Sequence, residues 1–218
     1  MHISFNIPLK SIMISLLIAA GISSCGGKED EPVPVDPSEI QYKTDTPAAA
    51  QQLPENRPPV INIVDTVSLK YVVLLMKDSV SSSDRLGQKM DNIYRNLLQK
   101  VIKENNLQVT GPRIAWYRSS SAPFFFEAGI PVNKKPTKKL PKNISVRNIG
   151  GDSAVIAHFY GPYPLSFQAY EAVKDWMGSR KKKNKGLPYE IYVDEPVDST
   201  GILKDPYRVR TDIVFPHK

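Results

Sequence analysis

The chain has little of what disulfide or metal chemistry requires. Its 218 residues include one cysteine, Cys25, which excludes a disulfide framework and any zinc site built from several thiolates. The three histidines, His2, His158 and His217, are scattered without HxH or HxxxH spacing. The sequence contains no Ser-His-Asp or Cys-His set of the kind that would indicate a familiar hydrolase. We therefore expect no metal and no cofactor.

The composition is that of a chain with a folded core. Hydrophobic residues make up 41% of the sequence and charged residues 23%, which is enough apolar material for a core and too little net charge to enforce disorder. The formal net charge is +7. Basic runs such as residues 134–142 and 181–183 lack interleaved aromatics, so they indicate solvated loops and we expect no nucleic-acid partner. Contact of these loops with anionic lipid or lipopolysaccharide is the alternative.

Residues 1–24 are typical of a secretory signal peptide. A single charge, Lys10, precedes an apolar run over residues 12–22 that is too short to span a bilayer. Cys25 follows, in the sequence Gly-Ile-Ser-Ser-Cys-Gly of residues 21–26. This segment resembles the lipobox of bacterial lipoproteins, whose cysteine thiol takes a diacylglycerol and becomes the new N-terminus. An ordinary signal peptide with a chance cysteine is the alternative.

The lipobox resemblance implies attachment to a lipid membrane through acylated Cys25, because two acyl chains anchor a protein without a spanning helix. Residues 26–31 (Gly-Gly-Lys-Glu-Asp-Glu) resemble the surface-export signal of Bacteroidetes lipoproteins, although a solvated charged tether would have the same composition. We expect a cell-envelope location, lipid-anchored at the outer membrane, on its periplasmic or outer face.

A proline-rich segment follows the cysteine. Seven prolines between residues 26 and 60 remove backbone donors and favour extended conformations. The sequence therefore predicts a flexible tether over residues 25–64 and a globular domain over residues 65–218.

The globular part shows the order strand, helix, strand, strand twice. The first unit has strands expected over residues 70–77, 113–117 and 124–132, and the second over residues 153–160, 189–194 and 209–215. Helical spacing places an apolar face on each intervening helix, formed by Leu86, Met90, Ile93 and Leu97 in the first unit and by Phe167, Tyr170 and Val173 in the second.

Local sequence similarity between the units supports a duplication. Residues 112–116 align with residues 188–192, which matches Trp116 to Tyr192, and Glu127 aligns with Asp212. Each unit alone would expose one face of its sheet, so pairing is favoured. We predict an α+β fold in which duplicated β-α-β-β units form one antiparallel sheet, with two helices on one face and a concave ligand trough on the other.

Four motifs in order carry a family resemblance. They are residues 126–132 (FEAGIPV), residues 161–163 (GPY) followed by Tyr170 and Trp176, residues 188–192 (PYEIY) and residues 213–216 (IVFP). The succession resembles the GyrI-like small-molecule-binding domain, which is also the effector-binding part of AraC-type and multidrug-sensing regulators. The resemblance covers roughly residues 68–218 and implies that the glutamate at the position of Glu190 meets cationic ligands.

Strand alternation gives the candidate site. If Tyr189 and Ile191 face the helix, Glu190 and Tyr192 face the trough, and the same logic places Glu127 there. We expect Glu190, Tyr192, Trp116 and Glu127 to bind a ligand, since aromatic rings and a partly buried carboxylate suit a flat lipophilic cation. A solvated or salt-bridged Glu190, and plain packing for the aromatic residues, are the alternatives.

Three functions are consistent with these features. The first is a membrane-anchored lipoprotein that binds a small amphipathic, possibly cationic, organic molecule. The second is a hydrolase of strained electrophilic small molecules, in which Glu190 or Glu127 would position or activate water. The third, a protein-binding module such as the gyrase inhibitors of the family, is disfavoured because export would remove that partner.

Overall fold

The domain consists of strands and three principal helical segments that follow the predicted order. The computed structural model describes residues 57–119 and 121–218, so the signal peptide, Cys25 and most of the tether lie outside the described residues. The strands are β1 (Val60–Val67), β2 (Tyr71–Val80), β3 (Arg113–Tyr117), β4 (Phe124–Val132), β5 (Ile144–Ile149), β6 (Ser153–Tyr160), β7 (Tyr189–Tyr192) and β8 (Arg210–Pro216). The helices are α1 (Leu86–Asn92), α2 (Leu98–Glu104) and α3 (Phe167–Ser179), with a π-helical turn η3 (Ile93–Leu97) joining α1 to α2 and short 3-10 turns η2 (Ser83–Arg85), η4 (Tyr163–Leu165) and η5 (Pro206–Arg208).

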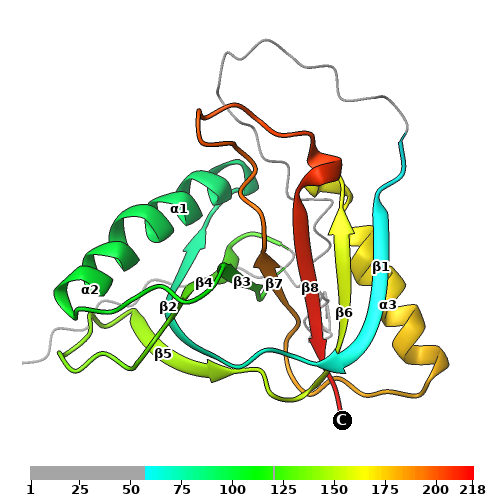
Figure 1. Cartoon of the computed structure of the whole chain (residues 1–218), viewed down its shortest axis with the longest axis horizontal. Coiled ribbons are helices and arrows are strands. Elements are labelled where there is room, and N and C mark those ends of the chain that lie inside the picture. Colours follow the sequence, from blue (N-terminus) through cyan, green and yellow to red (C-terminus); the bar gives the residue numbers. More distant parts are fainter. Residues whose placement is uncertain (1–56, 120) are drawn as a thin grey trace, which may run out of the picture. The chain divides into compact units, whose positions relative to one another are not determined.

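All eight strands form one antiparallel sheet in the order β1-β6-β8-β7-β3-β4-β2-β5. The order is symmetric about the β7–β3 pair, because β2, β4 and β3 of the first unit mirror β6, β8 and β7 of the second (Figure 1). The predicted duplication and the single antiparallel sheet are confirmed. The two units meet where Ala115 pairs with Glu190, at the centre of the sheet.

Two edge strands were not predicted, and they are exchanged between the units. Strand β1 precedes the first unit but pairs with β6 of the second, while β5 precedes the second unit and pairs with β2 of the first. The predicted boundary at residues 64/65 therefore falls inside β1, which begins at Val60. Edge strands expose one side, so the apolar pattern of β1 and β5 is weak. The prolines before β1 and the lysines before β5 favoured a prediction of tether and loop instead.

The helices cover one face of the sheet in two separate cores. The helix α1-η3-α2 packs on β2, β3 and β4, and α3 packs on β6 and β8. Ala115 belongs to the first core and Ile213 to the second, and both are paired with Glu190. Side chains directly opposite one another on paired strands share a face. Glu190 therefore lies on the helix-covered face, between the two cores.

The other face is concave and has an apolar centre. Val73, Ile114, Tyr189 and Val214 are buried there although no helix covers them. Burial raises the pKa of Tyr71 of β2, and the carboxylate of Asp212 of β8 adds to the rise although three strands, β7, β3 and β4, lie between them in the sheet. This influence across the sheet indicates that the sheet curls. The sheet is thus buried on both faces at its centre.

The first helix departs from its predicted apolar face in one place. Leu86, Met90 and Ile93 are buried as expected, but Leu97 is 37% exposed. The π-helical turn over Ile93–Leu97 adds one residue to the helical repeat, so Leu98 takes the buried position instead. A strict 3.6-residue period could not reveal this insertion.

We predict that Gly129 is required for close packing of β4 on β2. A Cβ atom at this position would lie 2.5 Å from Val73 Cγ1, which is shorter than any normal contact. Gly129→Ala should therefore lower the free energy of unfolding by about 1–3 kcal/mol, measured by denaturant titration. Gly178→Ala is the control, because a Cβ there meets nothing within 4 Å, and in helix α3 it should raise stability by up to about 1 kcal/mol. Equal stability of Gly129→Ala and the wild type would contradict this packing.

Candidate functional site

The four predicted ligand residues divide between the two faces of the sheet. Glu190 and Tyr192 lie on the helix-covered face, whereas Trp116 and Glu127 lie on the concave face. The prediction that Tyr189 and Ile191 face the helix is wrong, since both belong to the apolar centre of the concave face. The structure therefore contains two separate clusters, each with one buried glutamate.

Glu190 is fully buried among tyrosines. Tyr163 donates a hydrogen bond of 2.7 Å to Glu190 Oε2, and Tyr170 of α3 donates one of 2.9 Å to Oε1. Tyr163 comes from turn η4, just before α3, so two consecutive segments of the chain supply the donors. We call Tyr117, Tyr163, Tyr170 and Tyr192 the tyrosine cluster.

The tyrosine cluster connects the two helices across the centre of the sheet. The hydroxyls of Tyr117 and Tyr192 are 2.7 Å apart, and the hydroxyl of Tyr163 lies 3.2 Å from that of Tyr117. Tyr117 in turn contacts Met90 Sδ of α1 at 3.5 Å. Glu190 is enclosed, but Tyr117, Tyr163 and Tyr192 are only partly buried, so they form the side of the cluster nearest solvent.

Burial raises the pKa of Glu190 above its usual value, because desolvation penalises the ionised carboxylate. Hydroxyl hydrogen bonds from Tyr163, Tyr170 and Tyr192 oppose the rise without cancelling it. Within the described residues no lysine or arginine forms an ion pair with Glu190. Its proton is therefore held more tightly than that of an ordinary glutamate.

Glu127 is also fully buried, but basic side chains surround it. Arg118 donates to Oε1 at 2.6 and 2.9 Å from Nη2 and Nε, and Lys77 lies 3.7 Å away. Arg147 Nη2 lies 2.6 Å from Oε2 and forms an ion pair with it. The guanidinium of Arg147 also lies over the ring of Trp116, 5.1 Å from its centre. The positive charges of Arg118, Arg147 and Lys77 therefore compensate the negative charge of Glu127.

A one-residue shift between the units explains the misplaced residues. Trp116 pairs with Glu127, and the equivalent partner of Asp212 is Ile191, so Trp116 corresponds to Ile191 rather than to Tyr192. Tyr192 corresponds to Tyr117. Because side chains alternate along a strand, a shift of one residue exchanges the two faces. Alternation could not reveal the error, since both faces are buried and apolar here.

Sequence reasoning missed three members of the tyrosine cluster. Tyr117 was passed over for its neighbour Trp116, and Tyr170 was assigned to the core of its helix. Tyr163 stood in the motif Gly161-Pro162-Tyr163 but received no role. A proline that starts a helix directly after a strand fixes the next side chain near the sheet end, and this was the available signal for Tyr163.

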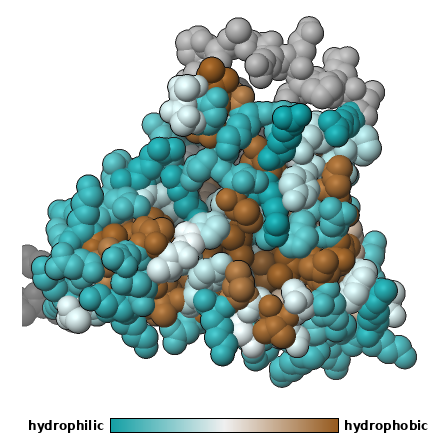
Figure 2. Space-filling model, viewed as in Figure 1, coloured by the Kyte–Doolittle hydropathy of each residue, from teal (hydrophilic) through white to brown (hydrophobic). Residues whose placement is uncertain are grey.

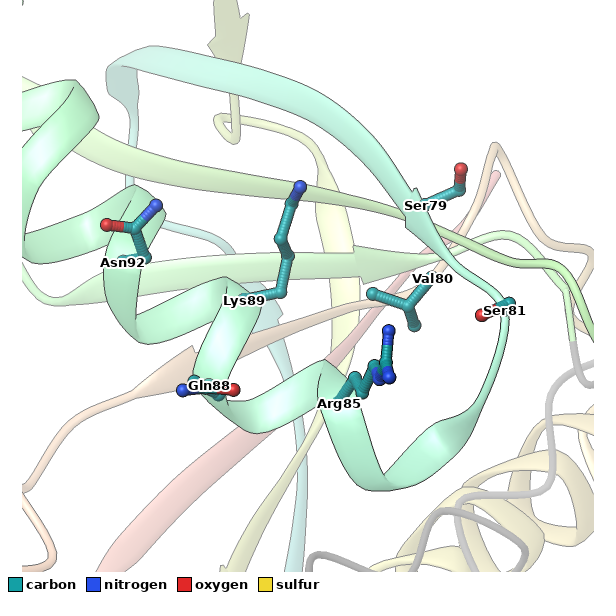
Figure 3. A pocket seen from close by; sticks show the side chains of 7 residues that line it. All are labelled: Ser79, Val80, Ser81, Arg85, Gln88, Lys89 and Asn92. Carbon is teal, nitrogen blue, oxygen red and sulfur yellow. The ribbon is translucent and has the colours of Figure 1, made fainter.

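A pocket of about 510 Å³ lies elsewhere, between the end of β2 and helix α1 (Figure 3). Its lining is Ser79, Val80, Ser81, Arg85, Gln88, Lys89 and Asn92. It contains none of the predicted ligand residues and one apolar side chain. Ligand sites for organic molecules are mostly apolar and aromatic, so we place the candidate site at the tyrosine cluster instead.

The helices within residues 57–119 and 121–218 are too short or too polar to span a membrane. Among the same residues, no group of three or more His, Cys, Asp or Glu side chains is placed to hold a metal ion.

Comparisons with known proteins agree on the fold. The crystal structure of the EcmrR C-terminal domain superposes with a TM-score of 0.57 at 20% identity, covering 73% of this chain and 98% of that one. The fold is therefore that of the EcmrR C-terminal domain. EcmrR in a cryo-EM EcmrR–DNA complex gives 0.57 at 19% identity, covering 73% of this chain. This chain spans 57% of the length of that EcmrR chain.

A third structure extends the comparison. An uncharacterized conserved protein from Listeria innocua gives a TM-score of 0.51 at 11% identity, covering 74% of this chain and 93% of that one. No family model matches the sequence, and no curated protein matches it. Identities this low establish shared architecture alone.

We predict that Glu190 makes stability depend on pH. Below its usual pKa of 4.5 the carboxyl is protonated in the folded and unfolded chains. Above that value the unfolded chain ionises first, so the wild type loses stability until the raised folded pKa is passed. Glu190→Gln should therefore gain stability relative to the wild type as pH rises from about 4.5, measured by denaturant titration at several pH values. Glu171→Gln, on the exposed side of α3, is the control. A stability difference between Glu190→Gln and the wild type that does not change with pH would contradict the burial cost.

Proposed function

We propose that the domain binds a flat, amphipathic organic cation at Glu190 and the tyrosine cluster. The observation that carries the proposal is a fully buried carboxyl that has no basic partner among residues 57–119 and 121–218. Aromatic hydroxyls surround it at the junction of the two units. A cation would compensate the ionised carboxylate, and the tyrosine rings would add stacking and cation–π attraction.

The contrast between the two glutamates supports Glu190 as the charge partner. Glu127 already has Arg118, Arg147 and Lys77 around it, so an additional cation would meet repulsion there. Glu190 has hydroxyl donors, which a ligand can replace or reorient. The sequence resemblance of residues 68–218 to the GyrI-like small-molecule-binding domain is consistent with a small-molecule role.

Binding is favoured over hydrolysis by the hydrogen bonds of Glu190. A glutamate that activates water needs an oxygen facing that water, but Glu190 is fully buried and its two oxygens accept hydrogen bonds from Tyr163 and Tyr170. Hydrolysis of a strained electrophile is therefore the second candidate function. The experiment described below can also detect it.

We predict that the domain prefers an aromatic cation over its neutral parent. N-methylacridinium should bind more tightly than acridine at pH 7.5, and Glu190→Gln should weaken the cation roughly 30-fold or more, because losing one partner of a desolvated pair costs about 2–5 kcal/mol. Calorimetric or fluorescence titration measures both affinities.

Glu127→Gln is the matched control, since it removes a buried carboxylate on the other face and should leave the preference for the cation intact. Equal binding of cation and neutral parent would contradict the proposal. Consumption of an electrophile by the wild type but not by Glu190→Gln would favour the hydrolase alternative.

We also propose that the protein is a lipoprotein anchored at the outer membrane through Cys25. The support is the sequence alone: a charge-poor apolar run, then Gly-Ile-Ser-Ser-Cys-Gly over residues 21–26 and a proline-rich segment before the domain. The ligand site would then stand in the cell envelope.

Acylation at Cys25 can be tested by one substitution. We expect Cys25→Ser to remain unprocessed or to leave the detergent phase, because only a thiol forms the thioether to diacylglycerol. Mass spectrometry of the N-terminus and detergent-phase partitioning are the measurements. Unchanged maturation and partitioning of Cys25→Ser would contradict the anchor.

A further inference from the structure

One end of the domain gathers the segments near the C-terminus. Ser68 donates its backbone N–H to Asp152, Lys185 to Pro216, and Lys218 to Lys183, with distances of 2.8–3.0 Å. These bonds bring the β1–β2 turn, the β5–β6 turn, the loop after α3 and the C-terminus together. We call this surface, formed by residues 67–70, 150–152, 181–187 and 217–218, the basic end; it lies at the lower edge of Figure 1.

The basic end has more positive charge than its carboxylates neutralise. Its lysines are Lys70, Lys181, Lys182, Lys183, Lys185 and Lys218. Asp65 pairs with Lys182 and Asp152 pairs with Lys185, both at 2.6 Å. In the part of the chain that the structure describes, the other four lysines have no ion pair with an Asp or Glu side chain, and all four are exposed.

Exposed aliphatic side chains stand among these lysines. Leu69 is 70% exposed, Val67 63% and Leu187 44%. Figure 2 shows apolar side chains between hydrophilic ones along the same lower edge. Lysine ammonium groups beside exposed leucines match the boundary of a bilayer, where phosphates meet acyl chains.

We propose that the basic end docks on an anionic phospholipid surface. The proposal rests on the membrane anchoring proposed above, which would hold the domain close to such a surface. A nucleic acid is the less favoured partner, because the exposed apolar groups are aliphatic and cannot stack on bases as aromatic rings do.

The connection to the anchor is long enough for this orientation. The chain enters the domain at the opposite end of β1, where Val60 pairs with Tyr160 and Arg57 lies over the ring of Tyr207. Residues 26–56 can span at most roughly 100 Å, whereas the eight-residue strand β1 is about 27 Å long. Tyr163 follows the end of β6 farthest from the basic end, so docking would leave the tyrosine cluster away from the bilayer.

The test is co-sedimentation of residues 25–218, with Cys25→Ser so that no acyl chain contributes, on vesicles. This form retains every described residue, and circular dichroism checks its fold. Vesicles of phosphatidylcholine with 30% phosphatidylglycerol should bind it, and pure phosphatidylcholine should bind far less. Binding should weaken strongly at 0.5 M salt, since screening acts on exposed charges.

Matched variants locate the surface. Lys70→Gln, Lys181→Gln and Lys183→Gln together should lower vesicle affinity on the order of 100-fold. The control removes three charges elsewhere, with Lys134→Gln, Lys135→Gln and Lys139→Gln, and should have a much smaller effect. Leu69→Ser with Leu187→Ser should lower affinity roughly tenfold. Ile202→Ser with Leu203→Ser is the apolar control, because Ile202 and Leu203 are each 60% exposed and lie outside the basic end.

Equal binding to anionic and neutral vesicles would overturn the proposal, as would an equal loss in the two triple lysine variants. Binding to a duplex oligonucleotide without binding to vesicles would overturn it in favour of a nucleic-acid partner. Because the protein tested carries no acyl chain and no ligand is added, failure here is distinct from failure of lipidation or of cation binding.

Discussion

The rest of the structure depends on a buried carboxyl group that has no basic partner in the described part of the chain. Glu190 lies at the centre of the sheet, opposite Ala115, where the two units meet. Water cannot solvate it there, and ionisation is costly unless a positive charge approaches. Tyrosine hydroxyls satisfy its oxygens but carry no charge. Ionisation of Glu190 therefore has a desolvation cost, which a cation of suitable shape would offset.

The two faces of the sheet stabilise buried acidic groups in different ways. On the concave face, Glu127 and Asp212 occupy equivalent positions, and arginines bind both: Arg118 and Arg147 at Glu127, and Arg210 at Asp212. On the helix-covered face, Glu190 has Ala115 as its equivalent, so the carboxyl exists in one unit only. The symmetry of the backbone is thus broken by chemistry at the junction, where one unit has a carboxyl group and the other a methyl group.

Periodicity within the sequence predicted the central strands, both helices and the duplication, because apolar patterns there are strong and long. Edge strands β1 and β5 were not predicted, because their exposed sides carry polar residues. In addition, prolines precede β1 and lysines precede β5. At the site, Glu190 and Tyr192 were identified and share one face, but Trp116 and Glu127 belong to the other. Pairing register decides this, and register depends on contacts between strands far apart in the chain. The same holds for Tyr163 and Tyr170, which only the packing of α3 brings to Glu190.

Proton release on cation binding tests the central claim most directly. Titration calorimetry with N-methylacridinium, in two buffers of different ionisation enthalpy at the same pH, gives the number of protons exchanged. If Glu190 is protonated when empty and ionised when occupied, the wild type should release up to one proton per ligand. The release should fall as pH rises through the raised pKa of Glu190, and Glu190→Gln should release none. Heats that do not depend on the buffer at any pH from about 4.5 upward, or equal release by Glu190→Gln, would contradict the account.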